Sequence, residues 1–237
     1  MTQHVLLNNI DHKDLRIIAD RSAALGDAVM SCVAFPNEFR NLQAHYPIFF
    51  QKDPQSGAFQ AIALLGLERG ENLFLTDKGW NAHYMPMVLE MQPFLIGTQS
   101  RPGEEAERVI HVDMSSPRVS ENEGHAVFLP HGGNTPFLEY IASLLEQVHM
   151  GASASAAFYE AVDALGLLEP FALDIELKDG RKSRLTGFYT INEEKLYALG
   201  GDDLSELNQQ GYLQPLFMAV ASLSNLRDLI ERKNQRL

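Results

Sequence analysis

The sequence contains only one cysteine, Cys32, among its 237 residues. A single cysteine excludes an intramolecular disulfide and is typical of a reducing compartment, so we expect the protein in the cytoplasm. Cys32 lies within the apolar run 29–35, where a thiol behaves as a small hydrophobic side chain. The sequence therefore predicts a buried structural cysteine rather than a reactive one.

Long hydrophobic runs are also missing. No stretch approaches the roughly 20 apolar residues that span a bilayer. The longest candidate, residues 213–226, is interrupted by Pro215, Ser222, Ser224 and Asn225. Residues 1–15 lack the basic region followed by an apolar region that marks a secretory signal. We therefore expect no insertion into a membrane.

Basic residues are scarce relative to acidic ones. The chain has 19 Lys and Arg against 31 Asp and Glu, which gives a net charge of −12 at pH 7. No dense cluster of Lys and Arg offsets this charge locally. Nucleic-acid phosphates and anionic membrane surfaces repel such a protein, so we expect no nucleic-acid partner.

The remaining composition is that of a folded protein, with 45% hydrophobic and 21% charged residues. Turn residues between short apolar runs predict antiparallel hairpins at 47–67 and at 172–189, the second around Asp179-Gly180. Helical spacing predicts a helix over 11–25 and a helical hairpin formed by 135–151 and 155–165. The expected fold class is α+β, with antiparallel hairpins and a helical C-terminal half.

The division into domains follows from a change in composition after Gly97. Residues 98–108 and 115–124 are polar and rich in Ser, Pro and Glu, which indicates mobile loops. We expect a single domain, 1–237, with two subregions, 1–97 and 125–237, joined by these loops at 98–124.

Residues 45–97 contain the stretch in which we expect a recognition site. The loops Glu68–Asn72 and Thr76–Tyr84 are expected to extend from buried strands, and polar loops on rigid strands are the usual carriers of recognition groups. The candidate ligand-binding or partner-binding residues are Glu68, Arg69, Asn72, Trp80, His83 and Tyr84. The alternative is that Trp80 is a core anchor covered by structured loops, because large aromatic residues also dominate cores.

A second candidate is an anion-binding site at Gly132-Gly133-Asn134-Thr135. Thr135 followed by Pro136 predicts a helix start, and the free N–H groups and dipole of a helix N-terminus attract phosphate or carboxylate. The alternative is a permissive loop with an N-cap, which needs no ligand.

A third candidate is a metal site. His111 and Asp113 lie two residues apart, so in a strand they share one face. With His125 or His131 they would supply the two histidines and one carboxylate of a non-haem iron site. Because such spacing is common by chance, we prefer a solvent-facing pair and expect no metal and no cofactor.

Several motifs follow one another through nearly the whole chain: YPIFF (46–50), AIALLGLERGENLFL (61–75), Gly79-Trp80, Tyr84-Met85-Pro86, Gln92-Pro93-Phe94, Phe128 with Gly132–Thr135, Gly187-Phe188-Tyr189, Ile191–Leu196 and Gly211-Tyr212-Leu213. In these motifs the sequence resembles the bacterial SapC family. It departs from the family pattern at 89–92, where Leu-Glu-Met-Gln replaces the preferred basic residues.

The resemblance implies an accessory role. Members of the family are associated with surface layers, are often labelled peptide-transport permeases, and neighbour flavin-dependent tryptophan halogenases and outer-membrane receptors in genomes. The permease label conflicts with the absence of apolar spans, and we follow the composition. We therefore expect a non-enzymatic cytoplasmic binding or accessory protein that assists a halogenase-type enzyme, a transport system or a surface-layer system.

Its partner would be a protein or a small molecule, and the sequence leaves the oligomeric state open. The first alternative is a metal-dependent enzyme that uses the 111–131 region. The second is a homo-oligomeric component of a surface layer.

Overall fold

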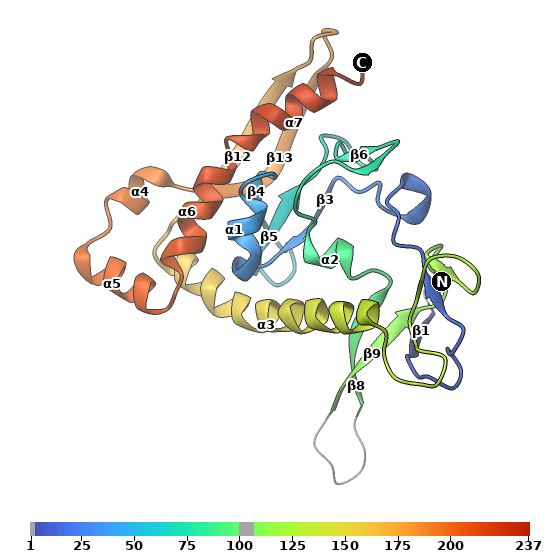
Figure 1. Ribbon diagram of the computed structural model, residues 1–237. Coiled ribbons are helices and arrows are strands. Elements are labelled where there is room, and N and C mark those ends of the chain that lie inside the picture. The colour runs from blue at the N-terminus through green and yellow to red at the C-terminus, as the bar shows by residue number, and fades with distance from the viewer. Residues whose placement is uncertain (1–2, 100–106) are drawn as a thin grey trace. The chain divides into compact units, whose positions relative to one another are not determined.

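The computed structural model describes residues 3–99 and 107–237 (Figure 1). The chain divides into two compact units: the first comprises Met1–Asp27 and Met87–Met150, the second Ala28–Pro86 and Gly151–Leu237. Each unit contains helices and antiparallel strands, which confirms the predicted α+β class. The boundaries of these units differ from those of the expected subregions, 1–97 and 125–237. Whether the chain is a single domain stays a prediction.

The second unit is built on a five-stranded antiparallel sheet with the strand order β12-β13-β4-β5-β3. Both predicted hairpins are present, β4 with β5 and β12 with β13. The bounds are β3 (Ser31–Ala34), β4 (Ile48–Lys52), β5 (Phe59–Leu64), β12 (Leu168–Glu176) and β13 (Lys182–Ile191). A smaller hairpin consists of β6 (Leu75–Thr76) and β7 (Gly79–Trp80).

Local turn chemistry explains the hairpin between β4 and β5. Asp53 Oδ1 accepts hydrogen bonds from the backbone N–H of Gln55 and Ser56 and from the Ser56 hydroxyl. These bonds, with those from Ser56 the strongest, hold the pKa of the exposed Asp53 carboxyl below its usual range. Gly57 completes the turn with a φ of 72°, which favours glycine.

Helices cover the sheet of the second unit. Their bounds are η2 (Pro36–Glu38), α1 (Phe39–Leu42), the second half of α3 (Pro136–Ala164), α4 (Glu193–Tyr197), α5 (Gly201–Gln209), α6 (Leu213–Ser222) and α7 (Asn225–Asn234). In the core, the Phe39 ring lies edge-on to Phe50 and Phe158, with centroids 6.3 and 6.2 Å away. Figure 1 shows α7 running alongside the β12–β13 hairpin, whose tip it holds through Lys178 and Glu231 (Nζ–Oε1 2.8 Å).

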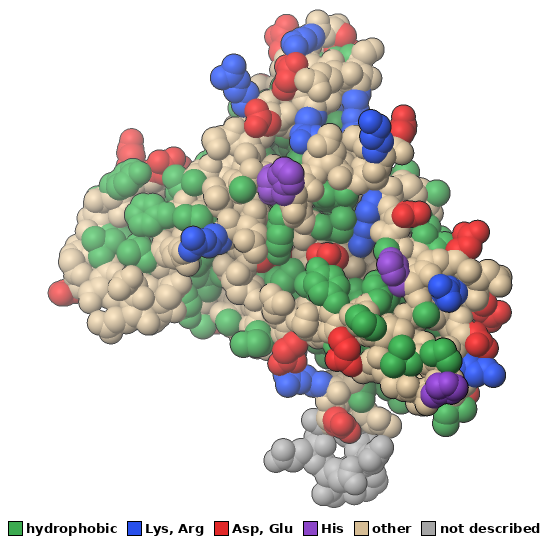
Figure 2. Space-filling view, in the orientation of Figure 1, with side chains coloured by type: hydrophobic (Ala, Val, Ile, Leu, Met, Phe, Trp, Pro, Cys, Tyr) green, Lys and Arg blue, Asp and Glu red, His purple; other side chains and the backbone are tan. Residues whose placement is uncertain are grey.

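The outer face of this hairpin is polar. Glu176 lies opposite Lys182 and Asp174 lies opposite Arg184, so opposite charges face each other across the two strands. Figure 2 shows acidic and basic side chains side by side at this hairpin. Such a balanced, exposed ladder contributes little free energy but keeps the edge strand solvated.

The first unit contains two three-stranded antiparallel sheets, β1-β9-β8 and β10-β2-β11. Its elements are β1 (His4–Leu6), β2 (Arg16–Ile17), η1 (Ala23–Leu25), α2 (Met87–Glu90), β8 (Phe94–Gln99), β9 (Glu107–Asp113), β10 (Val119–Ser120), β11 (His125–Ala126) and the first half of α3. Its most buried charges are Asp27 and Arg118, joined at 2.6 Å with side-chain exposures of 0% and 1%.

The helix predicted over 11–25 is wrong. Residues 16–17 form β2, which pairs with β10 on one side and β11 on the other. Leu15 and Ile17 are 4% and 1% exposed, which is the two-residue alternation of a strand. Backbone pairing with segments about 100 residues away therefore overrides the weak helical spacing.

The predicted helical hairpin is also wrong, because α3 runs without interruption from Pro136 to Ala164. Gly151 lies inside the helix, and a Cβ there would come within 2.8 Å of Phe35 Cβ and 2.7 Å of Asn37 Oδ1. The glycine therefore permits close packing instead of ending the helix.

The predicted loops at 98–108 and 115–124 are partly wrong, since β8 reaches Gln99, β9 begins at Glu107 and β10 occupies 119–120. The rest of the first loop, 100–106, lies outside the described residues. Within the described ranges, no helix combines the length and the apolar character needed to span a bilayer.

Candidate functional site

The predicted recognition loops lie in the second unit, around the buried phenol of Tyr46. Trp80 Nε1 donates to Tyr46 Oη at 2.9 Å, and the Trp80 ring stacks on Phe74 with centroids 6.1 Å apart. Tyr46 in turn donates to the carbonyl oxygen of Tyr84. Burial raises the pKa of Tyr46 well above its ordinary value, so the phenol stays neutral and keeps its proton for this bond.

Tyr84 extends this hydrogen-bond chain to a buried carboxylate. Its hydroxyl donates to Glu38 Oε2 at 3.0 Å, and Glu38 Oε1 accepts from the backbone N–H of Phe35 at 3.3 Å. Glu38 is only 2% exposed. The loop that carries Trp80 and Tyr84 is therefore fixed to the start of α1 and presents a rigid surface.

The other predicted loop is held by α7. Lys233 Nζ lies 2.6 Å from Glu71 Oε1 and 3.2 Å from Glu68 Oε1. Burial lowers the pKa of Lys233, but its bonds to Glu71 and Glu68 outweigh burial and raise the pKa above its usual value. Arg236 donates to the carbonyl oxygen of Asn72 at 3.1 Å. Glu68 and Asn72 are thus tied into the structure by residues more than 160 positions away.

Glu68, Arg69 and His83 are the exposed members of the predicted set. The His83 ring lies 6.0 Å from the His45 ring, which is edge-on to Tyr46 at 5.9 Å. Burial, His83 and Arg232 together lower the pKa of His45. The structure therefore gathers Trp80, His83 and Tyr84 around Tyr46. Glu68 is held by Lys233 of α7, and Asn72 by Arg236 just after α7. Among the described residues, no hydrogen bond or ion pair involves the Arg69 side chain.

At the predicted anion site, the N-cap is confirmed: Thr135 Oγ1 accepts from the backbone N–H of Leu138 at 3.3 Å. The Gly132 and Thr135 N–H groups donate to chain carbonyls at 3.0 and 3.1 Å. Asn134 Nδ2 donates to the Glu139 carboxylate at 2.7 Å. Most donors at this helix start are thus engaged within the chain, and anion binding stays a prediction.

The predicted metal ligands each have another environment. Asp113 Oδ1 accepts from the Ser115 hydroxyl and the backbone of Gln3, and these bonds, led by Ser115, lower its pKa. The His111 ring lies against Gly97, and His125 stacks on Phe137 with centroids 5.0 Å apart. His131 is exposed in a turn. Among the described residues, no group of three or more His, Cys, Asp or Glu side chains is arranged to hold a metal.

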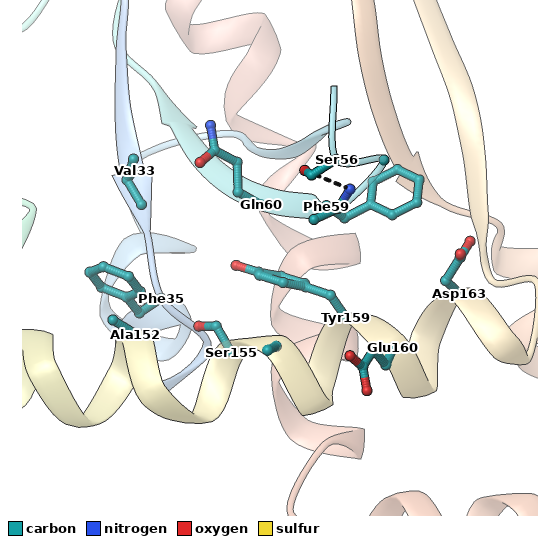
Figure 3. A pocket seen from close by; sticks show the side chains of 13 residues that line it. Val33, Phe35, Ser56, Phe59, Gln60, Ala152, Ser155, Tyr159, Glu160 and Asp163 are labelled. Atoms are coloured by element: carbon teal, nitrogen blue, oxygen red, sulfur yellow. Dashed lines mark hydrogen bonds between the residues drawn. The ribbon is translucent and has the colours of Figure 1, made fainter. Parts of the chain in front are cut away.

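A groove that the sequence did not indicate lies in the second unit, between the β4–β5 hairpin and α3. Figure 3 shows side chains that line it. Its volume is about 480 Å³. One stripe of α3 forms a wall, with residues at spacings of three and four: Ala152, Ser155, Ala156, Tyr159, Glu160 and Asp163. The opposite wall comprises Val33, Phe35 and residues 56–60.

Polar and apolar groups meet in this groove. Tyr159 is 8% exposed, and its hydroxyl accepts from the backbone N–H of Ala61 at 2.9 Å. Burial raises the pKa of Tyr159, so the phenol stays protonated. Phe35 and Phe59 supply buried apolar surface, and Gln60 is exposed. The run of small residues at 151–157 is the sequence feature that could have indicated this groove. It was predicted to connect two helices, but it lies within α3 and leaves space beside the sheet.

The sequence can be compared with known protein families. Residues 7–229 match the family model described as SapC, which covers almost the whole chain. No curated protein and no solved structure matches the chain. The chain therefore belongs to the SapC family.

Proposed function

We propose that this protein is a non-enzymatic binding protein with an accessory role, and that its ligand lies in the groove between the β4–β5 hairpin and α3. The observation that carries the proposal is the groove itself, whose volume of about 480 Å³ falls in the range typical of ligand sites. Apolar walls with a few fixed polar groups are the usual composition of such sites.

The titratable groups of the groove favour binding over catalysis. Its lining contains no His, Cys or Lys, which are common nucleophiles and proton-transfer groups. Tyr159 stays protonated, because burial raises its pKa, and its oxygen already accepts a hydrogen bond from the Ala61 N–H. Glu160 and Asp163 are exposed at the helix surface. These groups can orient a ligand but form no nucleophile with an adjacent base.

The compartment is part of the proposal. We place the protein in the cytoplasm, supported by the buried, unpaired Cys32, whose pKa burial raises well above the ordinary value. In a reducing compartment a free thiol stays reduced, so it needs no disulfide partner.

Ala156 gives a direct test of the groove. It lines the groove yet is exposed, so Ala156→Trp fills the space without disturbing the core. Ala157, its exposed neighbour outside the groove, provides the matched control Ala157→Trp. In native mass spectrometry of protein purified from its own host, we expect a retained ligand with the wild type and Ala157→Trp and its loss with Ala156→Trp. Equal retention by all three proteins would place the ligand elsewhere.

The surface formed by His83 and Tyr84, which we call the rim, is a second proposed binding site. Its ligand would be a partner protein. Its support is the rigid attachment of both residues around Tyr46. Thermal melts of His83→Ala and Tyr84→Phe, paired with pull-downs from the native host, test it. Loss of one partner without a lower melting temperature supports the rim as a contact. Unchanged melting with unchanged recovery for both variants would leave this surface a structural feature only.

A further inference from the structure

We infer that the groove takes an extended peptide segment with a basic side chain, which adds as a short strand to the free edge of β5. This inference rests on the proposed binding function and names the ligand class of the same groove. It follows from three features: an open backbone edge, a wall of small residues and the charge of the lining.

The hydrogen-bond pattern of β5 identifies the open edge. Leu64 N donates to Pro47 O at 2.9 Å, toward β4, whereas Leu65 N donates to Met30 O at 2.7 Å, toward the β3 side. Because backbone groups alternate between the two edges of a strand, the N–H and C=O of Phe59 also face the β3 side. These are the groups that an added strand would use.

No described strand occupies this edge beside Phe59. The β3 strand ends at Ala34, opposite Ala61, after which the chain leaves the sheet as η2. The N–H of Ala61 donates to the Tyr159 hydroxyl, because the neighbouring strand β3 stops at this point. The edge from Ala61 to Phe59 therefore faces the groove with an unpaired donor and acceptor at Phe59.

The wall of α3 leaves room for an extended segment. Ala152 and Ala156 line the groove one turn apart, and neither side chain extends beyond its Cβ. Figure 3 labels Ala152 on this wall. A strand lies about 4.8 Å from its neighbour and advances about 3.3 Å per residue, so roughly three residues fit along this short edge. Val33, Phe35 and Phe59 offer apolar surface to alternate side chains of the segment.

The charge of the lining selects the type of peptide. Glu160 and Asp163 are the charged residues of the groove, whose lining contains no Lys, Arg or His. The whole chain has a net charge of −12, which adds a long-range field of the same sign. Lys52, outside the lining, places its Nζ 4.9 Å from the centroid of the Phe59 ring, so the two carboxylates face one neighbouring cation and the local balance stays negative. A basic side chain is therefore favoured over an acidic one.

Affinity selection on the immobilised full-length protein tests these features. The probes are pools of acetylated, amidated pentapeptides with a central Lys or a central Glu, and a central-Lys pool with N-methylated backbone at the residues flanking the lysine. We expect the Lys pool to be enriched at least tenfold over the Glu pool at low salt. We expect N-methylation to remove this enrichment, because it blocks the backbone hydrogen bonds.

Three variants complete the design. Ala156→Trp should abolish enrichment, Ala157→Trp should leave it unchanged, and the exposed pair Glu160→Gln/Asp163→Asn should remove the preference for Lys while the fold survives. Equal enrichment of the Lys and Glu pools would overturn the charge selection, and equal enrichment of N-methylated peptides would overturn strand addition.

The failure of this inference is distinguishable from that of the proposed function. If no pool is enriched but native mass spectrometry shows a ligand that Ala156→Trp removes, the groove is a binding site and the peptide inference is wrong. If neither peptides nor a retained ligand depend on Ala156, both are wrong.

Discussion

The indole N–H of Trp80 donates to the hydroxyl of Tyr46 at 2.9 Å, and this bond anchors the predicted recognition loop to the core of the second unit. Tyr46 is completely buried, whereas Trp80 is partly exposed and stacks on Phe74. Trp80 thus combines the two roles that the sequence left open: one side of the residue is a core anchor, and the other reaches the surface.

Truncation of Trp80 is therefore expected to destabilise the protein. We expect Trp80→Ala to lower the free energy of unfolding by about 3 kcal/mol, the low end for Trp→Ala because the indole is not fully buried. Trp80→Phe should cost less, about 1–2 kcal/mol, since it keeps an aromatic ring but leaves Tyr46 without this donor. Urea unfolding of both variants measures the difference. A Trp80→Phe variant as stable as the wild type would contradict the role of the hydrogen bond, and equal costs for the two variants would contradict the packing role of the ring.

Loss of Lys233 should lower the free energy of unfolding more than loss of the exposed Lys178, which lies between β12 and β13. The Lys233 side chain is 8% exposed and bonds Glu71, itself 17% exposed, at 2.6 Å. We expect Lys233→Met to cost about 2–3 kcal/mol, because it leaves a partly buried carboxylate without its partner. The control is Lys178→Met, which breaks a pair of 66% and 46% exposed side chains and should cost less than about 1 kcal/mol.

The pair formed by Lys233 and Glu71 also predicts how the stability depends on pH. The pKa of Lys233 is raised in the folded state, so its stabilising contribution is complete below the unfolded pKa of about 10.4 and is lost as the pH rises through the folded pKa. The difference in stability between wild type and Lys233→Met should therefore shrink only at strongly alkaline pH. A difference that already shrinks between pH 7 and 9 would contradict this assignment.

Asp27 should be essential to the first unit. It is fully buried and faces Arg118 at 2.6 Å, with Arg21 at 3.4 Å from the same carboxylate. We expect Asp27→Asn to cost about 3–5 kcal/mol, since it leaves a buried guanidinium uncompensated. Asp174→Asn, at the exposed pair with Arg184, is the matched control and should change stability by less than about 0.5 kcal/mol.

Gly151 provides a test of packing against helix propensity. Alanine is favoured over glycine inside a helix by about 1 kcal/mol, yet a Cβ at Gly151 would lie 2.8 Å from Phe35 Cβ. We expect Gly151→Ala to destabilise the protein, because overpacking costs about 1–3 kcal/mol. Gly201→Ala is the control, since a Cβ there meets no atom within 4 Å and should be neutral or stabilising. Stabilisation by both substitutions would contradict the close contact.

The His45–His83 pair can be followed by NMR titration. The pKa of His45 is lowered by burial and then by the charges of His83 and Arg232. We expect His83→Ala to raise this pKa toward 6.5, while the control His131→Ala, in the first unit, leaves it unchanged. Because the folded-state pKa is depressed, the related stability is present above about pH 6.5 and is lost as the pH falls through the folded pKa. An unchanged His45 pKa in His83→Ala would contradict the coupling.

Local chemistry in the sequence determined the α+β class, the two hairpins and the start of α3 after Thr135. Asp53 and Gly57 shape their turn through bonds over two to four residues, and Asn192 caps α4 by accepting from Lys195 N at 2.8 Å. Interactions of such short range are encoded by neighbouring residues, so a single sequence reveals them. The cluster of Trp80, His83 and Tyr84 was predicted in the same way, from one short segment.

Only the tertiary structure decided the rest. The helical spacing at 11–25 gave way to backbone pairing with β10 and β11, and Gly151 became a packing position because Phe35 lies against it. Lys233 meets Glu71 across 162 positions, and the groove exists because small residues of α3 lie beside the edge where β3 ends. Such contacts depend on which distant segments meet, and residue spacing within one segment carries no information about that.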